Sequence, residues 1–211
     1  VTKTSPPDLT KDGGLDGISH CWEVWMGATG KPYYEKVSEV AYTGIKLIVE
    51  ALPKAVEKPD DMEARYALGL GTDLGGYAIM LGGTNGGHLG SFSLVDVLTH
   101  GRACAILNPY YTVLFSPAIQ DQLRRVATIY VDAGFMPPEK AEASGRKLAE
   151  AVAQAMIDFL KSIGFPTTLK EAGATEEHIE KMVKAAKDPQ LKMKLQNMPL
   201  PMDAEKGDVD R

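Results

Sequence analysis

The sequence predicts an all-α fold, a multi-helix bundle, and three observations support this class. Apolar residues recur at helical spacing through most of the 211 residues, as in Leu15, Ile18, Trp22 and Trp25. Proline and glycine stand at the ends of several such segments, where they commonly start or stop helices. No segment shows the convincing apolar–polar alternation typical of a half-buried strand. We therefore expect helices packed around one core.

The first expected helices have identifiable boundaries. Asp12 is a candidate N-cap for a helix through the proline-free stretch 13–30. An amphipathic segment over 37–52 predicts a second helix that ends at Pro53, since proline disrupts a helix interior. A third expected helix begins at the Asp60-Asp61 pair, where acidic groups suit the N-terminal end of the helix dipole.

The later expected helices follow the same pattern. One covers 103–114, and another includes 119–130 and is closed by Gly134. Pro138 in a first turn predicts a long helix running to Gly164. We expect residues 1–211 to form a single helical domain, with 197–211 as an irregular tail.

The first candidate site motif lies in the first expected helix. Asp16 and His20 are four residues apart, so they project from the same stripe of that helix. A carboxylate and an imidazole then converge on one point, and Glu23 is close enough to hydrogen-bond a metal-ligating side chain. The alternative is an exposed helical Asp and His, because this pair alone is a weak motif.

The second motif consists of two histidines at the ends of one segment. His88 lies in a glycine-rich tract, and His100 follows an apolar stretch. In one straight helix the two imidazoles would point about a third of a turn apart, so we expect a break before His100. The alternative for either residue alone is a core histidine with an ordinary hydrogen-bond partner.

Together these residues resemble the C-terminal, metal-binding domain of the iron-containing (group III) alcohol dehydrogenases. The resemblance rests on Pro6 to Glu23, on His88 with His100-Gly101-Arg102-Ala103, on Asn108-Pro109 and on Asn197-Met198-Pro199. It therefore covers essentially the whole chain.

The resemblance implies a metal site of four ligands: Asp16, His20, His88 and His100. Fe²⁺ is the family expectation, and the donor set of one oxygen and three nitrogens also suits Zn²⁺ or manganese. The related glycerol dehydrogenases and dehydroquinate synthases lack a histidine at the position of His20, so this residue favours the iron-type branch. The resemblance identifies no catalytic residue beyond these ligands.

The resemblance also implies an NAD- or NADP-dependent alcohol dehydrogenase acting on a small alcohol or aldehyde. The metal would polarise the alcohol or carbonyl oxygen during hydride exchange. The family's N-terminal α/β cofactor-binding domain is absent from this chain, so we expect it to act in cis or in trans and the chain alone to be incomplete. A homo-oligomer is a further implied partner.

Two features depart from the family pattern, and a third resembles an unrelated nucleotide-binding motif. The interval between His88 and His100 is shorter than in familiar bacterial members, and Phe92 replaces a second histidine thought to assist proton transfer. Residues 69–75 superficially resemble a dinucleotide fingerprint, but they follow a helix where the fingerprint requires a strand. We interpret these glycines as helix-packing positions.

The remaining histidine and cysteines give further expectations. His178 is separated from the apolar stripe of its helix and is predicted to be a solvated surface residue. Cys21 and Cys104 lie in apolar segments and are predicted to be reduced, buried thiols, with a soft-ligand role for Cys21 left open.

Composition excludes several classes of partner. The net charge of −5 gives no reason to expect nucleic acid, and no 18-residue apolar run or signal peptide predicts a membrane or export. We expect a cytoplasmic domain.

A second hypothesis is a catalytically incomplete scaffold or oligomerisation domain derived from the same family. The absent cofactor domain and Phe92 favour it. Retention of all four ligands favours the enzyme, because buried unpaired histidines and a carboxylate would otherwise cost stability.

Overall fold

The computed structural model describes residues 2–210, and every regular element in this range is a helix, which confirms the predicted all-α class. The α-helices are α1 (Pro7–Gly27), α2 (Tyr34–Glu57), α3 (Met62–Leu81), α4 (Gly86–Ser91), α5 (His100–Leu114), α6 (Gln120–Asp132), α7 (Pro138–Ala141), α8 (Gly145–Ser162), α9 (Glu176–Ala186) and α10 (Lys192–Gln196). Short 3₁₀ turns occupy Ser116–Ala118, Pro189–Leu191, Ala204–Lys206 and Asp208–Asp210.

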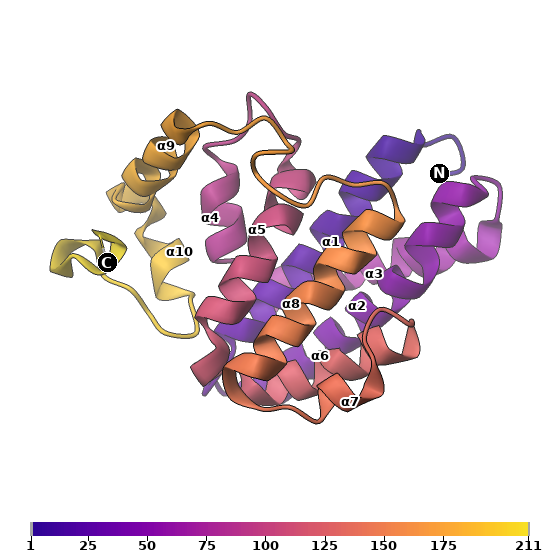
Figure 1. Ribbon diagram of the computed structural model, residues 1–211, viewed down its shortest axis with the longest axis horizontal. Helices are drawn as coiled ribbons and strands as arrows, with labels where there is room; N and C mark the ends of the chain where they lie inside the picture. Colours follow the sequence, from indigo (N-terminus) through magenta and orange to yellow (C-terminus); the bar gives the residue numbers. More distant parts are fainter. Residues whose placement is uncertain (1, 211) are drawn as a thin grey trace.

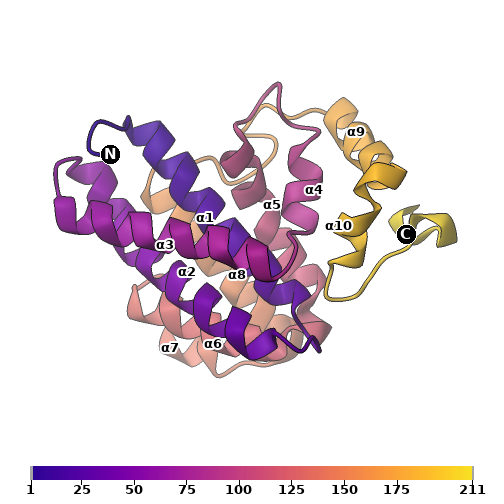
Figure 2. The same cartoon turned by 180° about the vertical axis from the view of Figure 1, so that it is seen from behind.

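Helix α1 lies at the centre of the bundle and contacts α2, α3, α4 and α5. Helices α2 and α3 pack together on one side of it, and α5, α6 and α8 form the other side (Figure 1). Helices α9 and α10 and the C-terminal turns lie at one end of the molecule, beside α4 (Figures 1 and 2). The C-terminal segment therefore packs against the part of the chain that carries His88.

Two fully buried tryptophans anchor α1 in this core. Trp22 and Trp25 meet edge to face, with ring centroids 5.9 Å apart. The indole N–H of Trp22 donates to Thr112 Oγ1 of α5 at 2.8 Å, and that of Trp25 donates to Ser38 Oγ of α2 at 2.8 Å. Each buried ring thus has a polar partner, which fixes α1 relative to both neighbours.

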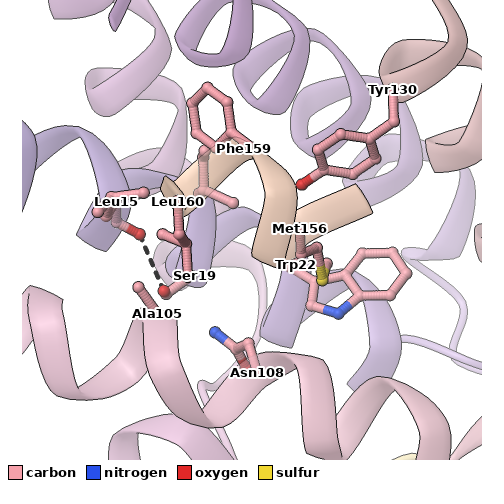
Figure 3. Close-up of a pocket in the computed structure, with 10 residues that line it drawn as sticks. Leu15, Ser19, Trp22, Ala105, Asn108, Tyr130, Met156, Phe159 and Leu160 are labelled. Carbon is pink, nitrogen blue, oxygen red and sulfur yellow. Dashed lines mark hydrogen bonds between the residues drawn. The ribbon is translucent and has the colours of Figure 1, made fainter. Parts of the chain in front are cut away.

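A cavity of about 20 Å³ lies in the core between α1, α5, α6 and α8 (Figure 3). Its lining is mostly apolar and includes Trp22, Met156 and Phe159, with the amide of Asn108 at one wall. Pockets for organic ligands typically occupy several hundred Å³. The cavity is therefore a packing feature of the core, and none of the four predicted metal ligands lines it.

Three predicted helix boundaries are wrong. Helix α1 begins at Pro7, because proline suits a first helical turn, and Asp12 lies inside the helix. Helix α2 continues through Pro53 to Glu57, with Ala51, Leu52 and Ala55 buried, so packing outweighs the loss of one backbone hydrogen bond.

The third wrong boundary is that of the long helix predicted from Pro138 to Gly164. Pro138 starts only the four-residue α7, and α8 starts separately at Gly145. Gly145 has φ of +60°, a left-handed conformation that interrupts a helix and that glycine adopts without steric cost.

Other predicted boundaries are confirmed. Asp61 caps α3, accepting a hydrogen bond from the backbone N of Ala64 at 3.0 Å. The helix of 119–130 ends as expected near Gly134, which has φ of +80°. The expected break before His100 is also present, since α4 ends at Ser91 and α5 begins at His100.

The prediction that His178 is a solvated surface residue is wrong. Its relative exposure is 7%. His178 is the third residue of α9, where its Nδ1 accepts from the backbone N of Thr175, while its Nε2 faces the Asp96 carboxylate. The predicted apolar stripe was also wrong: His178 lies on the packed face of α9 with Met182 and Ala186, whereas Ile179 and Val183 are 43% and 39% exposed.

The glycines of 69–75 pack helices together, as the sequence predicted. The segment lies inside α3 and follows no strand. A Cβ at Gly71 would lie 2.6 Å from Ile48 of α2, and one at Gly75 would lie 2.9 Å from the backbone O of Gly17 in α1. These positions allow α3 to approach both neighbours closely.

No helix formed by the described residues has the length and apolar character needed to cross a membrane.

The neighbouring glycines of α3 provide a matched test of this packing. Gly75→Ala should lower the free energy of unfolding by about 1–3 kcal/mol, because the added methyl overpacks against the α1 backbone. At Gly76 no atom beyond the adjacent residues and the backbone of its own helix lies within 4 Å of the added Cβ, and Gly76→Ala should raise stability by about 1 kcal/mol through helix propensity. Urea unfolding measures both values, and equal effects at the two positions would contradict the close approach.

Candidate metal centre

The structure brings together the four side chains that the sequence singled out. Asp16 and His20 stand one turn apart on α1, His88 is on α4, and His100 is the first residue of α5. One ligand atom from each residue can be chosen so that all four atoms lie within 4.8 Å of one another. Three helices thus contribute to one cluster.

The Asp16 carboxylate lies among the three imidazoles. Its Oδ2 is 3.5 Å from His20 Nε2, and its Oδ1 is 3.6 Å from His100 Nε2 and 3.8 Å from His88 Nε2. Strong hydrogen bonds are shorter than these separations. Ligand atoms of a tetrahedral site with bonds of about 2.1 Å lie about 3.4 Å apart, close to the spacing found here.

Two atoms of this cluster are buried and have no hydrogen-bond partner among the described residues. They are Asp16 Oδ1 and His88 Nε2. Leaving a buried polar atom unpaired costs free energy, and a carboxylate oxygen cannot donate a proton to an imidazole lone pair. The donor set therefore fits a cation held between the two atoms.

Glu23 fixes the orientation of His88. Its Oε1 lies 2.8 Å from His88 Nδ1, and its Oε2 accepts from the backbone N of Asn85 at 2.7 Å and of His88 at 3.3 Å. The Glu23 side chain is fully buried. A carboxylate at this position holds the proton on Nδ1, so the lone pair of Nε2 faces Asp16.

The electrostatics of Glu23 follow from the same contacts. Burial alone would raise the pKa of this carboxyl group. The nearby His88, which is also a hydrogen-bond partner, and the backbone N–H donors outweigh burial and lower the pKa below its usual range. Glu23 is therefore ionised at neutral pH and caps the first turn of α4.

His100 is oriented by Ser91. The Ser91 hydroxyl donates to the backbone O of His88 at 2.7 Å, so the 3.1 Å contact with His100 Nδ1 uses Ser91 Oγ as acceptor. His100 therefore carries its proton on Nδ1 and presents Nε2 to the cluster. The Phe92 ring lies nearly parallel to that of His100, with centroids 6.5 Å apart.

His20 completes the cluster. Its ring stacks on that of His88, with centroids 4.9 Å apart. Burial lowers the pKa of His20, and the nearby Asp16 carboxylate opposes this shift only in part. The neutral imidazole is thus favoured at neutral pH, which is the form that binds a metal ion.

A glycine allows α5 to reach α1 at this point. A Cβ at Gly101 would lie 2.3 Å from the backbone O of Asp12 and 2.9 Å from Asp16 Cβ. Arg102, the next residue, donates to the Asp12 carboxylate. The His100-Gly101-Arg102 sequence therefore docks the start of α5 beside the first ligand pair.

Sequence reasoning found Glu23 but missed Ser91 and Asn85. Their roles depend on the path of the chain around α4, which no local sequence pattern specifies. Asn85 is the N-cap of α4, and its amide donates to the Glu23 backbone O at 2.8 Å. The one available signal was its position before the Gly86-Gly87 helix start, which is typical of an N-cap.

Both cysteines are free and buried, as predicted. Cys21 faces α2, where its Sγ would lie 2.7 Å from a Cβ at Gly44, and burial raises its pKa to about 12. Cys104 lies on the site side of α5, and its Sγ is 3.9 Å from His100 Nε2. Burial also raises the pKa of Cys104, so the thiol stays protonated at neutral pH.

Comparison with known proteins gives a match over most of the chain. Residues 10–206 match the model of the Fe-containing alcohol dehydrogenase family, C-terminal. The chain is 29% identical over 208 residues to long-chain-alcohol dehydrogenase 1 of Geobacillus thermodenitrificans (strain NG80-2), an alignment that covers 96% of this chain and 49% of that relative. It is 28% identical to the NAD-dependent methanol dehydrogenase of Bacillus methanolicus, covering 86% and 46%.

Solved structures share the fold. Sulfoacetaldehyde reductase from Bifidobacterium kashiwanohense, crystallised in complex with NAD⁺, has a TM-score of 0.71 and 28% identity over 99% of this chain and 50% of that one. Alcohol dehydrogenase from Oenococcus oeni has a TM-score of 0.80 over 98% and 51%, and its 24% identity supports the fold alone. The chain thus spans about half the length of the curated relatives it matches.

The shifted pKa values predict that acid destabilises the metal-free chain. His20 and Glu23 both have folded-state pKa values below their ordinary values of 6.5 and 4.5. The unfolded chain then binds more protons, so stability falls as pH decreases, first through His20 below about pH 6.5 and then through Glu23 below about pH 4.5. Urea unfolding across this range, in the presence of a chelator, measures the effect.

Two single substitutions show which residue causes each part of the loss of stability at low pH. His20→Asn should flatten the upper part of the decline, and Glu23→Gln should flatten the lower part. A metal-free chain whose stability is constant from about pH 7 to about pH 4 would contradict the predicted linkage.

Proposed function

The chain belongs to the iron-containing alcohol dehydrogenase family, and from this premise we propose that it is the metal-binding part of an NAD(P)-dependent alcohol dehydrogenase. Asp16, His20, His88 and His100 would hold one divalent ion. Fe²⁺ is the ion we expect from the family's description, and Zn²⁺ is the alternative that the donor set also accommodates.

The observation that carries this proposal is the pair of buried, unpaired atoms at the centre of the cluster, Asp16 Oδ1 and His88 Nε2. A core that had lost its ion would be stabilised by apolar or hydrogen-bonded replacements at these positions. The second candidate is a scaffold derived from the same family. It does not explain why a carboxylate and three imidazoles converge with no hydrogen bond among them. The geometry therefore favours the metal-dependent enzyme.

A divalent ion in this site would supply Lewis-acid chemistry, polarising a carbonyl oxygen during reduction or lowering the pKa of an alcohol during oxidation. The residues of this chain prepare the site for it. Glu23 and Ser91 keep the protons of His88 and His100 on Nδ1, so both Nε2 lone pairs are available. His88 closes the buried side of the cluster, with a side-chain exposure of 6%.

The substrate would approach from the open side of the cluster. The His100 side chain is 43% exposed, that of Asp16 is 25% exposed and that of His20 is 20% exposed. A small alcohol or aldehyde is the substrate class we propose. Its oxygen would meet the site on the face bounded by these three side chains.

Hydride exchange requires a nicotinamide cofactor, for which we propose an α/β domain in cis or in trans. One relative is named as NAD-dependent and another as an NADPH-dependent butanol dehydrogenase, so relatives of this chain use either nucleotide. The glycines of 69–75 lie inside α3 and pack against α1 and α2, so they do not serve as a nucleotide loop. We therefore propose that the loop that binds the cofactor phosphates belongs to that α/β domain.

Metal content tests the site directly. The purified 211-residue chain, refilled with Fe²⁺ under anaerobic conditions, should hold about one ion per chain by elemental analysis, as a four-ligand site binds a single ion. The Asp16→Ala, His100→Ala double variant should hold none, because half of the ligands are removed. Asp132→Ala, on the exposed end of α6, is the matched control for loss of a carboxylate.

The same experiment includes a stability measurement. Free metal at 100 times its Kd should raise the free energy of unfolding of the parent chain by about 2.7 kcal/mol and leave the double variant unchanged. A parent chain that binds no ion and gains no stability would overturn the enzyme proposal and leave the scaffold.

Activity tests the chemistry separately. We expect a chimera of this chain, joined at its N-terminus to the cofactor domain of a family relative, to oxidise a primary alcohol with reduction of NAD or NADP. The double variant should lose about 10²- to 10³-fold in kcat, the scale seen when electrostatic stabilisation of the reacting oxygen is removed. Nucleotide absorbance measures the rate, and equal activity of the two chimeras would contradict the assigned metal role.

A further inference from the structure

Helices α4 and α5, which carry His88 and His100, are joined by eight residues, 92–99, which we call the inter-histidine loop. It begins after Ser91, the last residue of α4, and leads directly to His100, the first residue of α5. Within the loop the side chains of Leu94 and Leu98 are buried, whereas Phe92 is 44% exposed and Val95 is 71% exposed. The loop therefore rests on two leucines and has a largely open outer side.

One side chain of the loop is tied to the C-terminal part of the molecule. Both oxygens of Asp96 face His178 Nε2, at 3.2 and 3.3 Å. The other ring nitrogen of His178 accepts from the backbone N of Thr175 at 3.1 Å, which leaves the proton of a neutral imidazole on Nε2. One tautomer of His178 thus caps α9 and donates to Asp96.

The end of the loop is held on the opposite side. Thr99, which directly precedes His100, donates from Oγ1 to Asp12 Oδ2 of α1 at 2.8 Å. Helix α9 also packs on α4, where a Cβ at Gly90 would lie 3.2 Å from Met182 Sδ. Helix α9 therefore touches the helix of His88 directly and reaches the loop of His100 through His178.

We propose that His178, acting through Asp96, is a positioning residue that holds the inter-histidine loop and thereby sets the place of His100 relative to His88. His178 does not touch the four-residue cluster itself. The inference rests on the proposed metal-binding function and assigns α9 a part in it. The C-terminal segment then serves as a brace for the site.

The physical basis is the entropy of the loop. His100 is the most exposed of the three clustered histidines and lies at a helix start, so its position depends on the chain that leads to it. A loop released from Asp96 samples more conformations, and metal binding must then restrict them. Loss of residues that orient metal ligands typically weakens binding by about 10- to 100-fold.

Asp96 is the better position for the test, because its side chain is 57% exposed and its replacement leaves the cap of α9 in place. Asp96→Ala removes the tie and one negative charge. Asp96→Asn removes the same charge but keeps an oxygen that accepts the His178 proton. The two variants therefore differ in the hydrogen bond and not in the electrostatic attraction for a cation.

The experiment measures Zn²⁺ affinity of the full 211-residue chain by competition with a chromophoric chelator at neutral pH. We expect Asp96→Ala to weaken binding about 10-fold and Asp96→Asn to stay within about twofold of the parent, since only the first loses the residue orienting the loop. The double variant His178→Ala, Asp96→Ala should bind Zn²⁺ no more weakly than the weaker-binding of the two single variants, because both substitutions remove the same contact. Asp132→Ala controls for a carboxylate lost elsewhere.

Hydrogen exchange of the metal-free chain supplies a readout independent of metal. The backbone N–H groups of Val97 and Leu98, which donate to Leu94 O, should exchange faster in Asp96→Ala than in Asp96→Asn. Faster exchange together with weaker Zn²⁺ binding supports the inference. Equal Zn²⁺ affinity of the two Asp96 variants, or equal exchange in them, would overturn the role of His178 and Asp96 but not the proposed metal site. A parent chain that binds no metal would overturn the proposed function as well.

Discussion

The buried carboxylate of Glu23 is the constraint on which the site depends. It is fully buried on α1, and its oxygens face the backbone N of Asn85, the backbone N of His88 and the ring of His88. A buried carboxylate is stable only if it is paired and hydrogen-bonded. Glu23 therefore holds α4 at one place against α1 and fixes the tautomer of His88. A Cβ at Gly87 would lie 2.5 Å from Glu23 Oε1, so the glycine start of α4 is part of the same arrangement.

The cluster around Asp16 has the opposite character, because it leaves a buried carboxylate oxygen and a buried imidazole nitrogen unpaired side by side. Elsewhere among the described residues, Asn108 and Arg65 also have buried side-chain atoms without a hydrogen-bond partner. Trp22 and Trp25 both have hydrogen-bond partners, whereas Asp16 Oδ1 and His88 Nε2 have none among the described residues. An unsatisfied buried group costs about 1–3 kcal/mol. The surrounding helices supply the stability that keeps these atoms in place. Such a local cost beside a well-packed core is typical of a functional site.

The sequence predicted the elements whose geometry is local. Asp16 and His20 share a stripe because an α-helix has a fixed period, and the offset between His88 and His100 requires a break. The family resemblance then predicted that the two motifs form one metal site, which the spacing of the residues alone could not predict. Ser91 and His178 escaped prediction because their partners are set by the path of residues 92–99 and by where α9 packs. Pro53 escaped for a similar reason, since tertiary burial of its neighbours outweighed the local preference against proline.

The two histidines that flank the inter-histidine loop are held to different degrees. His88 is buried and hydrogen-bonded to a fully buried carboxylate, while the His100 side chain is 43% exposed and contacts the hydroxyl of Ser91 and the ring of Phe92. A site with one rigid ligand and one adjustable ligand can keep its position in the core while its open side adapts. The stacked Phe92 ring limits that adjustment, because a large displacement of His100 would lose the contact between the rings. Phe92, at the position where the resemblance implies a second histidine, therefore makes the open side of the cluster more apolar and restrains the exposed imidazole.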